Sequence, residues 1–461
     1  MSGALKPYPK YKESGVEWLG AVPEGWEITR VGWLYMRMKL TGHPDEELLS
    51  VYRDYGVIPK SSRDDNFNKP SENLDPYQLV QPGDLVLNKM KTWQGAIGIS
   101  RFRGIVSPAY IVCKKTAHPY SGGVNEPYFN YLVRIPLYAA WFASLSQGIR
   151  PNQWDLDFDD FKTVSVLLPP LPEQQAIADY LDAETQRIDT LIAELREMIR
   201  LLKEKRQALI SHCVTKGLDP TVPMKDSGVE WLGEVPEGWE VVRVKHVIES
   251  IEQGWSPQCY PYPAGENEWG VLKVGCVNSG IFRPQENKAL PEDLEPREWL
   301  SIKSGDVLVS RANTRALVGS TAVSSQDYPR LLLSDKVYRL RVNVRSMTPG
   351  FLGLQLRGPA ARALIELNAS GASDSMQNIS QETIAAVRIA IPPLPDQHAI
   401  AAHLDRETAK IDRLISETED TITLMQERRS VLISSVVTGK VRVPGLPKPS
   451  GSTLNSRPEN S

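Results

Sequence analysis

The sequence predicts an α+β protein in which two similar domains follow one another and are joined by two long helices forming an antiparallel coiled coil with pseudo-twofold symmetry. Three observations predict this class: 461 residues are too many for one ordinary core, a segment near the N-terminus returns in mid-chain, and a helix-forming segment also occurs twice. The predicted division is 1–170 for the first domain, 171–217 for the first helix, 218–393 for the second domain, 394–440 for the second helix and 441–461 for a disordered tail.

The first repeated segment opens each domain. ESGVEWLGAVPEGWEITRV at Glu13–Val31 and DSGVEWLGEVPEGWEVVRV at Asp226–Val244 are identical at 15 of 19 positions. The repeat period is far longer than the roughly 20 to 50 residues of a solenoid unit, so two equivalent domains are expected. The tryptophans of the segment, Trp18, Trp26, Trp231 and Trp239, are either core residues or a docking patch. The usual burial of Trp favours the core.

The second repeated segment opens each helix. PPLPEQQAIADYLDAETQRIDTLI from Pro169 and PPLPDQHAIAAHLDRETAKIDRLI from Pro392 are identical at 16 of 24 positions. Apolar residues then recur three and four apart, which predicts a coiled-coil seam. The predicted seam residues are Ile177, Leu181, Ile188, Leu191, Leu195, Leu202, Ile400, Leu404, Ile411, Leu414, Met425 and Leu432. The second seam is more polar, with Thr418 where the first copy has Leu195.

An antiparallel pair within the chain is the simplest way to bury both stripes, because one helix leaves each domain and both share one chain. Long helices packed in another way, or a coiled coil between two copies of the chain, are the alternatives.

The segments between these repeats are nearly unrelated in the two copies. Short strands broken by Gly, Pro and Asn are expected in both, for example LLSVY, DLVLN and AIGIS in the first and WGVLKVG and DVLVSRA in the second. Each series ends in a helical stretch, EPYFNYLVRIPLYAAWFASLS or PGFLGLQLRGPAARALIELNA. The repeated segments therefore form a common frame in both copies, and the segments between them differ.

The net charge of −3 argues against a nucleic-acid binder, but the local charge does not. Residues 301–345 carry eight basic residues against three acidic ones, a surplus that could neutralise several phosphates. These basic residues are Lys303, Arg311, Arg315, Arg330, Lys336, Arg339, Arg341 and Arg345.

Four loops occupy equivalent places in the two copies. NKMKTWQG (88–95) and RANTR (311–315) follow a shared Gly-Asp turn, and GIRPNQWD (148–155) and GASDSMQN (371–378) precede their PPLP by the same distance. Polar loops are usually solvated turns, but Arg, Lys, Asn and Gln also read base edges, so loops that differ between copies suggest two specificity surfaces. The candidate DNA-binding residues are Lys60, Arg63, Lys89, Lys91, Trp93, Gln94, Arg150, Asn152, Gln153, Arg311, Asn313, Thr314, Arg315, Lys336, Gln377 and Asn378.

Enzymatic and membrane classes lack their sequence signals. The chain has no GxxxxGK[ST] phosphate loop and no dinucleotide-binding glycine motif. Its four cysteines are far apart, which suggests neither a metal site nor disulfides. No stretch has the roughly 20 apolar residues of a membrane span, and the N-terminus does not read as a secretion signal. We therefore expect a cytoplasmic protein without catalytic residues, metal, bound cofactor or membrane partner.

The repeated motifs resemble those of the specificity (S) subunits of type I restriction-modification systems. The resemblance lies in the two SGVEWLG.VPEGW segments, the two PPLP[ED]Q openings, the helices after them and the endings at Thr215 and Thr438. It covers all but the last 20 or so residues. Two motif pairs in the correct order make it specific.

The resemblance implies that each variable segment is a target recognition domain for one half of a split double-stranded DNA site. The helices would then set the spacer and dock two methylation (M) subunits, and restriction (R) subunits would complete the assembly. That complex would be a DNA adenine-N6 methyltransferase and ATP-dependent endonuclease, with S-adenosylmethionine, ATP and Mg on the partner subunits. A stand-alone DNA-binding or scaffold protein without a methylation partner is the alternative.

Overall fold

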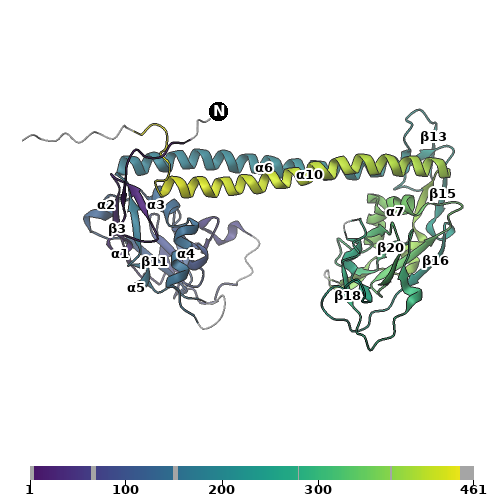
Figure 1. Cartoon of the computed structure of the whole chain (residues 1–461), viewed down its shortest axis with the longest axis horizontal. Helices are drawn as coiled ribbons and strands as arrows, with labels where there is room; N and C mark the ends of the chain where they lie inside the picture. The colour runs from purple at the N-terminus through teal and green to yellow at the C-terminus, as the bar shows by residue number, and fades with distance from the viewer. Residues whose placement is uncertain (1–4, 64–68, 149–153, 279, 374–375, 447–461) are drawn as a thin grey trace, which may run out of the picture. The chain divides into compact units, whose positions relative to one another are not determined.

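The computed structural model describes residues 5–63, 69–148, 154–278, 280–373 and 376–446. The chain divides into two compact units. Unit 1 comprises residues 1–195 and 420–461, and unit 2 comprises residues 196–419. Each unit therefore contains one domain together with the beginning of one long helix and the end of the other (Figure 1). The division predicted from the sequence instead treated each domain and each helix as a separate segment.

The repeated N-terminal segment folds in the same way in both units. A short hairpin, β1 (Tyr11–Glu13) with β2 (Ala21–Pro23), is matched by β13 (Met224–Asp226) with β14 (Glu234–Pro236). The next strand, β3 (Glu27–Arg30) or β15 (Glu240–Arg243), pairs antiparallel with the strand that precedes the long helix, β12 (Ser165–Leu168) or β27 (Arg388–Ile391). The repeat thus closes each domain by joining its first and last parts.

A four-stranded antiparallel sheet lies inside each domain. Its order is β4-β11-β8-β9 in unit 1 and β16-β24-β20-β22 in unit 2. The strands of unit 1 are β4 (Tyr35–Arg37), β8 (Leu85–Asn88), β9 (Ile97–Ile99) and β11 (Tyr110–Lys115). Those of unit 2 are β16 (Ile248–Gln253), β20 (Val307–Ser310), β22 (Thr321–Val323) and β24 (Val337–Val342). The predicted strands DLVLN, AIGIS and DVLVSRA all fall in these sheets.

The remaining strands differ between the units. Unit 1 has two separate pairs, β5 (Leu49–Tyr52) with β6 (Gly56–Pro59) and β7 (Gln78–Val80) with β10 (Gly104–Val106). Unit 2 has a four-stranded sheet of order β18-β17-β23-β19. Its strands are β17 (Gly270–Leu272), β18 (Asn287–Ala289), β19 (Ser301–Ile302) and β23 (Tyr328–Leu332). The difference lies in the segments whose sequences are unrelated.

Helices complete each domain. The predicted helical stretches form α3 (Glu126–Leu132) with α4 (Pro136–Leu145), and α7 (Pro349–Arg357) with α8 (Pro359–Leu367). Short α-helices are α1 (Val31–Leu34), α2 (Pro119–Gly122), α5 (Phe158–Phe161) and α9 (Gln381–Ala386). The 3-10 helices are η1 (Lys60–Ser62), η2 (Thr92–Gln94), η3 (Val244–His246), η4 (Val274–Val277) and η5 (Glu298–Leu300).

A buried glutamine fastens the start of each long helix to its domain. Gln174 accepts a hydrogen bond from the backbone N–H of Asn125 at 2.9 Å and donates to the carbonyls of Gly123 and Pro169. Gln397 makes the equivalent bonds to the N–H of Thr348 and the carbonyls of Ser346 and Pro392. Asn125 and Thr348 are the N-caps of α3 and α7. The glutamine of PPLP[ED]Q therefore fixes the angle at which helix and domain meet.

The glycine after each long helix lies against the second tryptophan of the repeated segment. Gly439 and Gly217 have φ angles of 72° and 77°. A Cβ atom at Gly439 would lie 2.5 Å from Pro23, and one at Gly217 would lie 3.2 Å from the ring of Trp239. A left-handed conformation and this close approach both require glycine. Trp26 and Trp239 are buried, at 1% and 5% exposure, so they belong to the core as predicted.

The two long helices are α6 (Leu171–Lys216) and α10 (Leu394–Val437), each continuous in Figure 1. In unit 1, Arg429 Nε lies 3.0 Å from Asp189 Oδ1, and in unit 2, Arg206 Nε lies 2.9 Å from Asp412 Oδ1. The two ion pairs join equivalent positions when the helices are aligned on their PPLP openings. Each unit pairs the first half of one helix with the second half of the other, so the predicted antiparallel pair is confirmed.

The seam confirms most of the predicted residues and corrects two. Leu191 and Leu414 are exposed, at 38% and 47%, and Ile192 and Ile415, one position later, turn inward instead. Either residue of each adjacent apolar pair gives a spacing of three and four along the helix. The periodicity alone therefore could not tell which of the two lies in the seam, and the residue chosen was the exposed one. The buried or half-buried seam comprises Leu181, Thr185, Ile188, Ile192, Leu195, Ile199, Leu202, Leu404, Thr408, Ile411, Ile415, Thr418, Ile422, Met425 and Leu432. Ile177 and Ile400 are also buried, in the cores of their own domains.

The chain directly after α10 packs on unit 1. Val443 is 1% exposed, and Lys6 forms a bridge with Arg442. Residues 441–446, which the sequence assigned to a disordered tail, are thus ordered; residues 447–461 of that tail lie outside the described residues. Within the described parts of the chain, no helix is both long and apolar enough to cross a membrane.

Candidate nucleic-acid interface

The two predicted loops of unit 2 are joined by a short strand pair. Strand β21 (Ala312–Asn313) pairs antiparallel with β26 (Met376–Asn378), which also pairs with β25 (Ser370–Ser373). Asn313 lies opposite Gln377, and the N–H of Ile379 donates to the carbonyl of Arg311 at 3.0 Å. Loops more than fifty residues apart in the sequence therefore form one surface. Their equivalent places in the two copies had suggested this.

The other candidate residues of unit 2 lie around this strand pair. The backbone N–H groups of Arg311 and Ala312 donate to the carbonyl of Lys336, whose side chain is exposed. Arg311 Nη1 donates to the carbonyl of Asp335 at 3.3 Å, and Asn313 Nδ2 donates to Asn278 Oδ1 at 2.9 Å. Thr314 and Arg315 follow directly, and Arg315 Nε lies 3.1 Å from Glu366. The structure therefore brings all seven candidates of this unit together.

The equivalent loops of unit 1 also lie side by side. The rings of Trp93 and Trp154 are 5.0 Å apart at 54°, and Lys89 Nζ lies 3.0 Å from Asp155 Oδ2. The N–H of Leu156 donates to the carbonyl of Lys89. The neighbouring candidates Lys91 and Gln94 are exposed. The candidates Arg150, Asn152 and Gln153 lie outside the described residues.

The remaining candidates of unit 1, Lys60 and Arg63, lie at η1 directly after strand β6. The guanidinium of Arg63 lies 4.6 Å from the centre of the Tyr55 ring, in the hairpin turn between β5 and β6. Arg53, in the same turn, lines a pocket of about 490 Å³ with Trp93, Gln94 and Arg134. The hairpin thus brings Arg63 and the Trp93 loop into one region. Sequence reasoning missed Arg53 and Tyr55, because no repeat marks this turn, and it missed Arg134, which lies in the predicted helical stretch and not in a polar loop.

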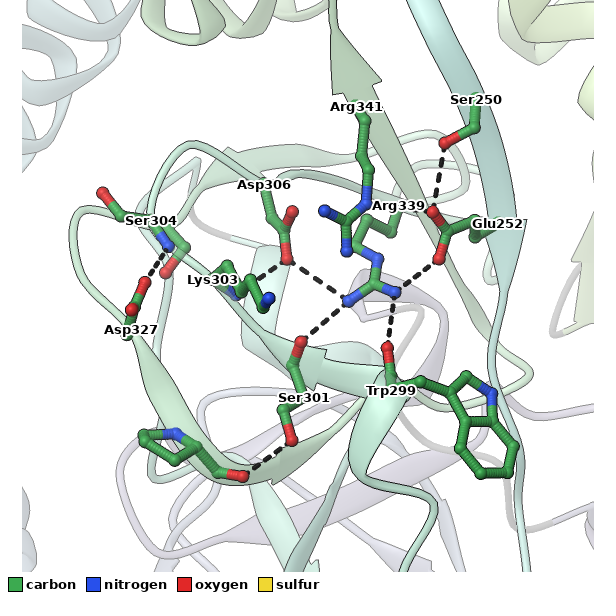
Figure 2. A network of polar contacts seen from close by, with 12 residues as sticks. Ser250, Glu252, Trp299, Ser301, Lys303, Ser304, Asp306, Asp327, Arg339 and Arg341 are labelled. Atoms are coloured by element: carbon green, nitrogen blue, oxygen red, sulfur yellow. Dashed lines mark hydrogen bonds and ion pairs between the residues drawn. The ribbon is translucent and has the colours of Figure 1, made fainter.

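The basic surplus of residues 301–345 is smaller at the surface than the sequence suggests. Arg339 is fully buried within β24. Figure 2 shows its guanidinium between Glu252 and Asp306, donating also to the carbonyls of Ser301 at 2.8 Å and Trp299 at 3.1 Å. Arg341 lies beside it, with Nε 3.0 Å from Glu252. The prediction that Arg339 is available to phosphates is wrong, because a sequence count treats every charge as exposed.

The pKa values of the two carboxylates in this network shift in opposite directions. Burial alone would raise the pKa of Glu252, but the hydrogen bond and charge of Arg339, together with Ser250 and Arg341, hold it below its ordinary value. Burial raises the pKa of Asp306, and this effect exceeds the opposing hydrogen bond from the Lys303 N–H and the charges of Arg339 and Arg341. A buried, fixed network of this kind supports the domain and does not offer charge to a ligand.

Comparisons with known proteins agree with the predicted resemblance. Residues 236–424 match the family model of the type I restriction modification DNA specificity domain. The specificity subunit of the type I restriction enzyme EcoEI of Escherichia coli is 24% identical over 86% of this chain and 80% of its own length. The specificity subunit of MjaVIII from Methanocaldococcus jannaschii is 25% identical over 92% of this chain and 95% of its own length.

A solved structure shares the fold. It belongs to a study of complex assembly and conformational transition in a type I R-M system, and it aligns with a TM-score of 0.66 at 17% identity. The alignment covers 91% of this chain and 99% of that chain. The family model and these relatives confirm the resemblance to specificity subunits, and the structural likeness confirms the fold class of two similar α+β domains in tandem joined by long helices.

Proposed function

From the premise that the chain carries a type I restriction modification DNA specificity domain, we propose that it is the DNA-reading subunit of a type I restriction-modification complex. Each domain reads one half of a bipartite site in double-stranded DNA. The paired helices set the spacer and dock two methylation subunits. S-adenosylmethionine, ATP and Mg are used by the methylation and restriction subunits, and this chain selects the sequence on which they act.

One observation carries the proposal: each unit presents a pair of loops at the same place on the same frame, with different side chains. In unit 2 the loops meet at the pairing of Asn313 with Gln377, and in unit 1 at the contact of Trp93 with Trp154. Arg, Asn and Gln can make paired hydrogen bonds to base edges in the major groove. Loops that vary on a constant frame are suited to reading different half-sites.

The test exchanges one recognition surface and maps the methylated sequence. The full chain is produced with its methylation subunit in a host free of adenine methylation, and N6-methyladenine is located by sequencing. Replacing residues 301–380 by the equivalent span of a relative should alter one half of the recognised site and leave the other half and the spacer unchanged. Arg345→Ala, an exposed basic residue beyond β24, is the control and should leave both halves unchanged.

Two outcomes would contradict the proposal. A change in both halves would show that the domains do not read separately. Methyl transfer to DNA by the purified chain alone, with S-adenosylmethionine but without a partner, would show that the chain is itself an enzyme.

A further inference from the structure

A basic pocket lies beside the junction of α7 and α8 in unit 2, and one of its lining residues, Asn278, accepts a hydrogen bond from Asn313 of β21. It has a volume of about 260 Å³ and is lined by Arg357 and Arg362 from this junction, Arg206 from α6, and polar side chains that include Asn278. None of the described residues that line it is acidic. Three arginines line one small cavity, and one of them, Arg206, also pairs with Asp412.

Neutral acceptors hold two of these arginines in place. Arg357 donates from Nη1 to the carbonyl of Gly280 at 2.7 Å and from Nε to the carbonyl of Gly353 at 3.2 Å. Arg362 donates from Nη2 to the carbonyl of Ala316 at 3.0 Å and from Nη1 to the carbonyl of Val318. Carbonyl groups orient a guanidinium but carry no negative charge. Both side chains are therefore fixed without being neutralised.

Two carboxylates near the pocket each pair with an arginine other than Arg357 and Arg362. Asp412 pairs with Arg206, and Glu366 pairs with Arg315 outside the pocket. Among the described residues, no carboxylate lies within ion-pair distance of Arg357 or Arg362. Burial lowers the pKa of both arginines, but guanidinium groups stay charged at neutral pH. The charges of Asp405 and Asp412 favour the ionised form of Arg357, and that of Glu366 favours the ionised form of Arg362, but no described carboxylate forms an ion pair with either arginine. An anion in the pocket would supply that direct partner.

Unit 1 has a pocket at the corresponding junction, but with different contents. Arg134, just after the end of α3, corresponds to Arg357 and donates from Nη2 to the carbonyl of Arg53 at 2.8 Å. Ala139 stands where unit 2 has Arg362, and Arg53, Trp93, Gln94 and Pro136 complete the lining. One arginine per junction is thus part of the common frame. Arg362 has no counterpart in unit 1, whereas the counterpart of Arg206 is Arg429, which is absent from the lining of the unit 1 pocket.

We propose that the unit 2 pocket binds a phosphate group of the DNA backbone, with Arg357, Arg362 and Arg206 as its ligands. Arginine is suited to this ligand because its planar fork matches two phosphate oxygens. This inference rests on the proposed function, and it adds a contact that fixes the position of unit 2 on DNA irrespective of base sequence. The same charge could hold free inorganic phosphate, so the test includes both sources.

The test measures how DNA affinity of the full chain depends on salt. Each phosphate contact contributes about 0.9 to the slope of log affinity against log salt concentration. Arg362→Gln should lower the slope by about this amount, which corresponds to roughly an eight-fold loss of affinity at 0.1 M salt. Arg206→Gln should also lower the slope, and Arg206→Lys should retain most of it. Arg200→Gln is the matched control on α6, because Arg200 pairs with Glu197 and Glu204 and is absent from the pocket lining.

The outcomes separate the inference from the proposed function. If wild type binds DNA and Arg362→Gln and Arg206→Gln keep its slope while remaining folded by thermal melting, the pocket assignment is wrong and DNA reading stands. If inorganic phosphate raises the Tm of wild type and not of Arg362→Gln, with the DNA slopes unchanged, the pocket takes a free anion, which overturns the assignment to DNA. If wild type does not bind DNA at all, both the proposed DNA-reading function and the assignment of the pocket to a DNA phosphate are wrong.

Discussion

The central strands of the two units occupy the same place in their sheets but bury different side chains. In unit 1, β11 pairs with β8 and places Val112 opposite Val86. In unit 2, β24 pairs with β20 and places Arg339 opposite Leu308 at the corresponding register. Val112 lies in an apolar cluster, whereas Arg339 is enclosed by the network of Glu252 and Asp306. The same frame thus accepts either an apolar or a charged interior.

The difference shows how a charge can replace apolar packing at a buried position. Burying a guanidinium is costly unless its charge and its donors are both satisfied. Arg339 meets these needs with two carboxylates and two main-chain carbonyls, although its Nε has no partner among the described residues. Those carbonyls belong to Trp299 and Ser301, so the network also attaches η5 and β19 to the sheet (Figure 2). Unit 1 needs no such attachment, because its second pair of strands is arranged differently.

The largest effect is expected from removing the buried charge. Arg339→Met should destabilise unit 2 by about 3 to 5 kcal/mol, because it leaves the buried Asp306 without its ion-pair partner and leaves Glu252 with Arg341 as its ion-pair partner. Val112→Ala, at the equivalent place in unit 1, should cost about 1.5 kcal/mol, because it removes only buried apolar groups. Hydrogen exchange followed by mass spectrometry on peptides from β24 and β11 measures the two losses separately in one chain.

Arg341→Met is the control for the first prediction. Arg341 pairs with the same Glu252 but is 36% exposed, so its loss should cost less than about 1 kcal/mol. Equal protection of β24 in wild type and Arg339→Met would mean that the buried network contributes no stability, and the contrast between the interiors would be one of side-chain identity alone.

A second contrast concerns one buried hydrogen-bond site that the units fill from different helix turns. In unit 1, Tyr128 Oη lies 3.2 Å from the carbonyl of Leu167 and 3.4 Å from that of Val437. In unit 2, Gln355 Nε2 lies 2.8 Å from the equivalent carbonyls, those of Ala390 and Val214. Gln355 stands one turn later in α7 than Tyr128 does in α3. Either residue ties the last strand of its domain to the end of a long helix.

These two residues should differ in what their removal costs. A hydroxyl has one hydrogen for the two carbonyls, whereas the amide of Gln355 has two and serves both. Gln355→Leu should therefore cost about 2 to 3 kcal/mol and Tyr128→Phe about 1 kcal/mol. Denaturant unfolding of the full chain and hydrogen exchange at β27 and β12 measure both. A larger loss for Tyr128→Phe would contradict this count of donors.

The sequence predicted the frame of the protein well because the frame is what the duplication preserves. The repeated openings predicted the two domains and both helices, and the aligned loops predicted which segments meet, such as RANTR with GASDSMQN. The seam positions Leu191 and Leu414 were wrong by one residue, because adjacent apolar residues satisfy both spacings. Arg339 and the pocket arginines depend on contacts between distant segments that no local pattern encodes.

The smallest loss of stability is expected from removing the ion pairs between the long helices, which are equivalent in the two units. Asp189→Asn and Asp412→Asn each remove one of the two equivalent ion pairs between α6 and α10. Their carboxylates are 54% and 45% exposed, so each change should cost only about 0.2 to 1 kcal/mol, and added salt should reduce that cost. Thermal melting at low and high salt gives both values. Near-equal losses are required if the helices pair as equivalent halves, and a loss confined to one variant would show that only one of the two contacts is structurally important.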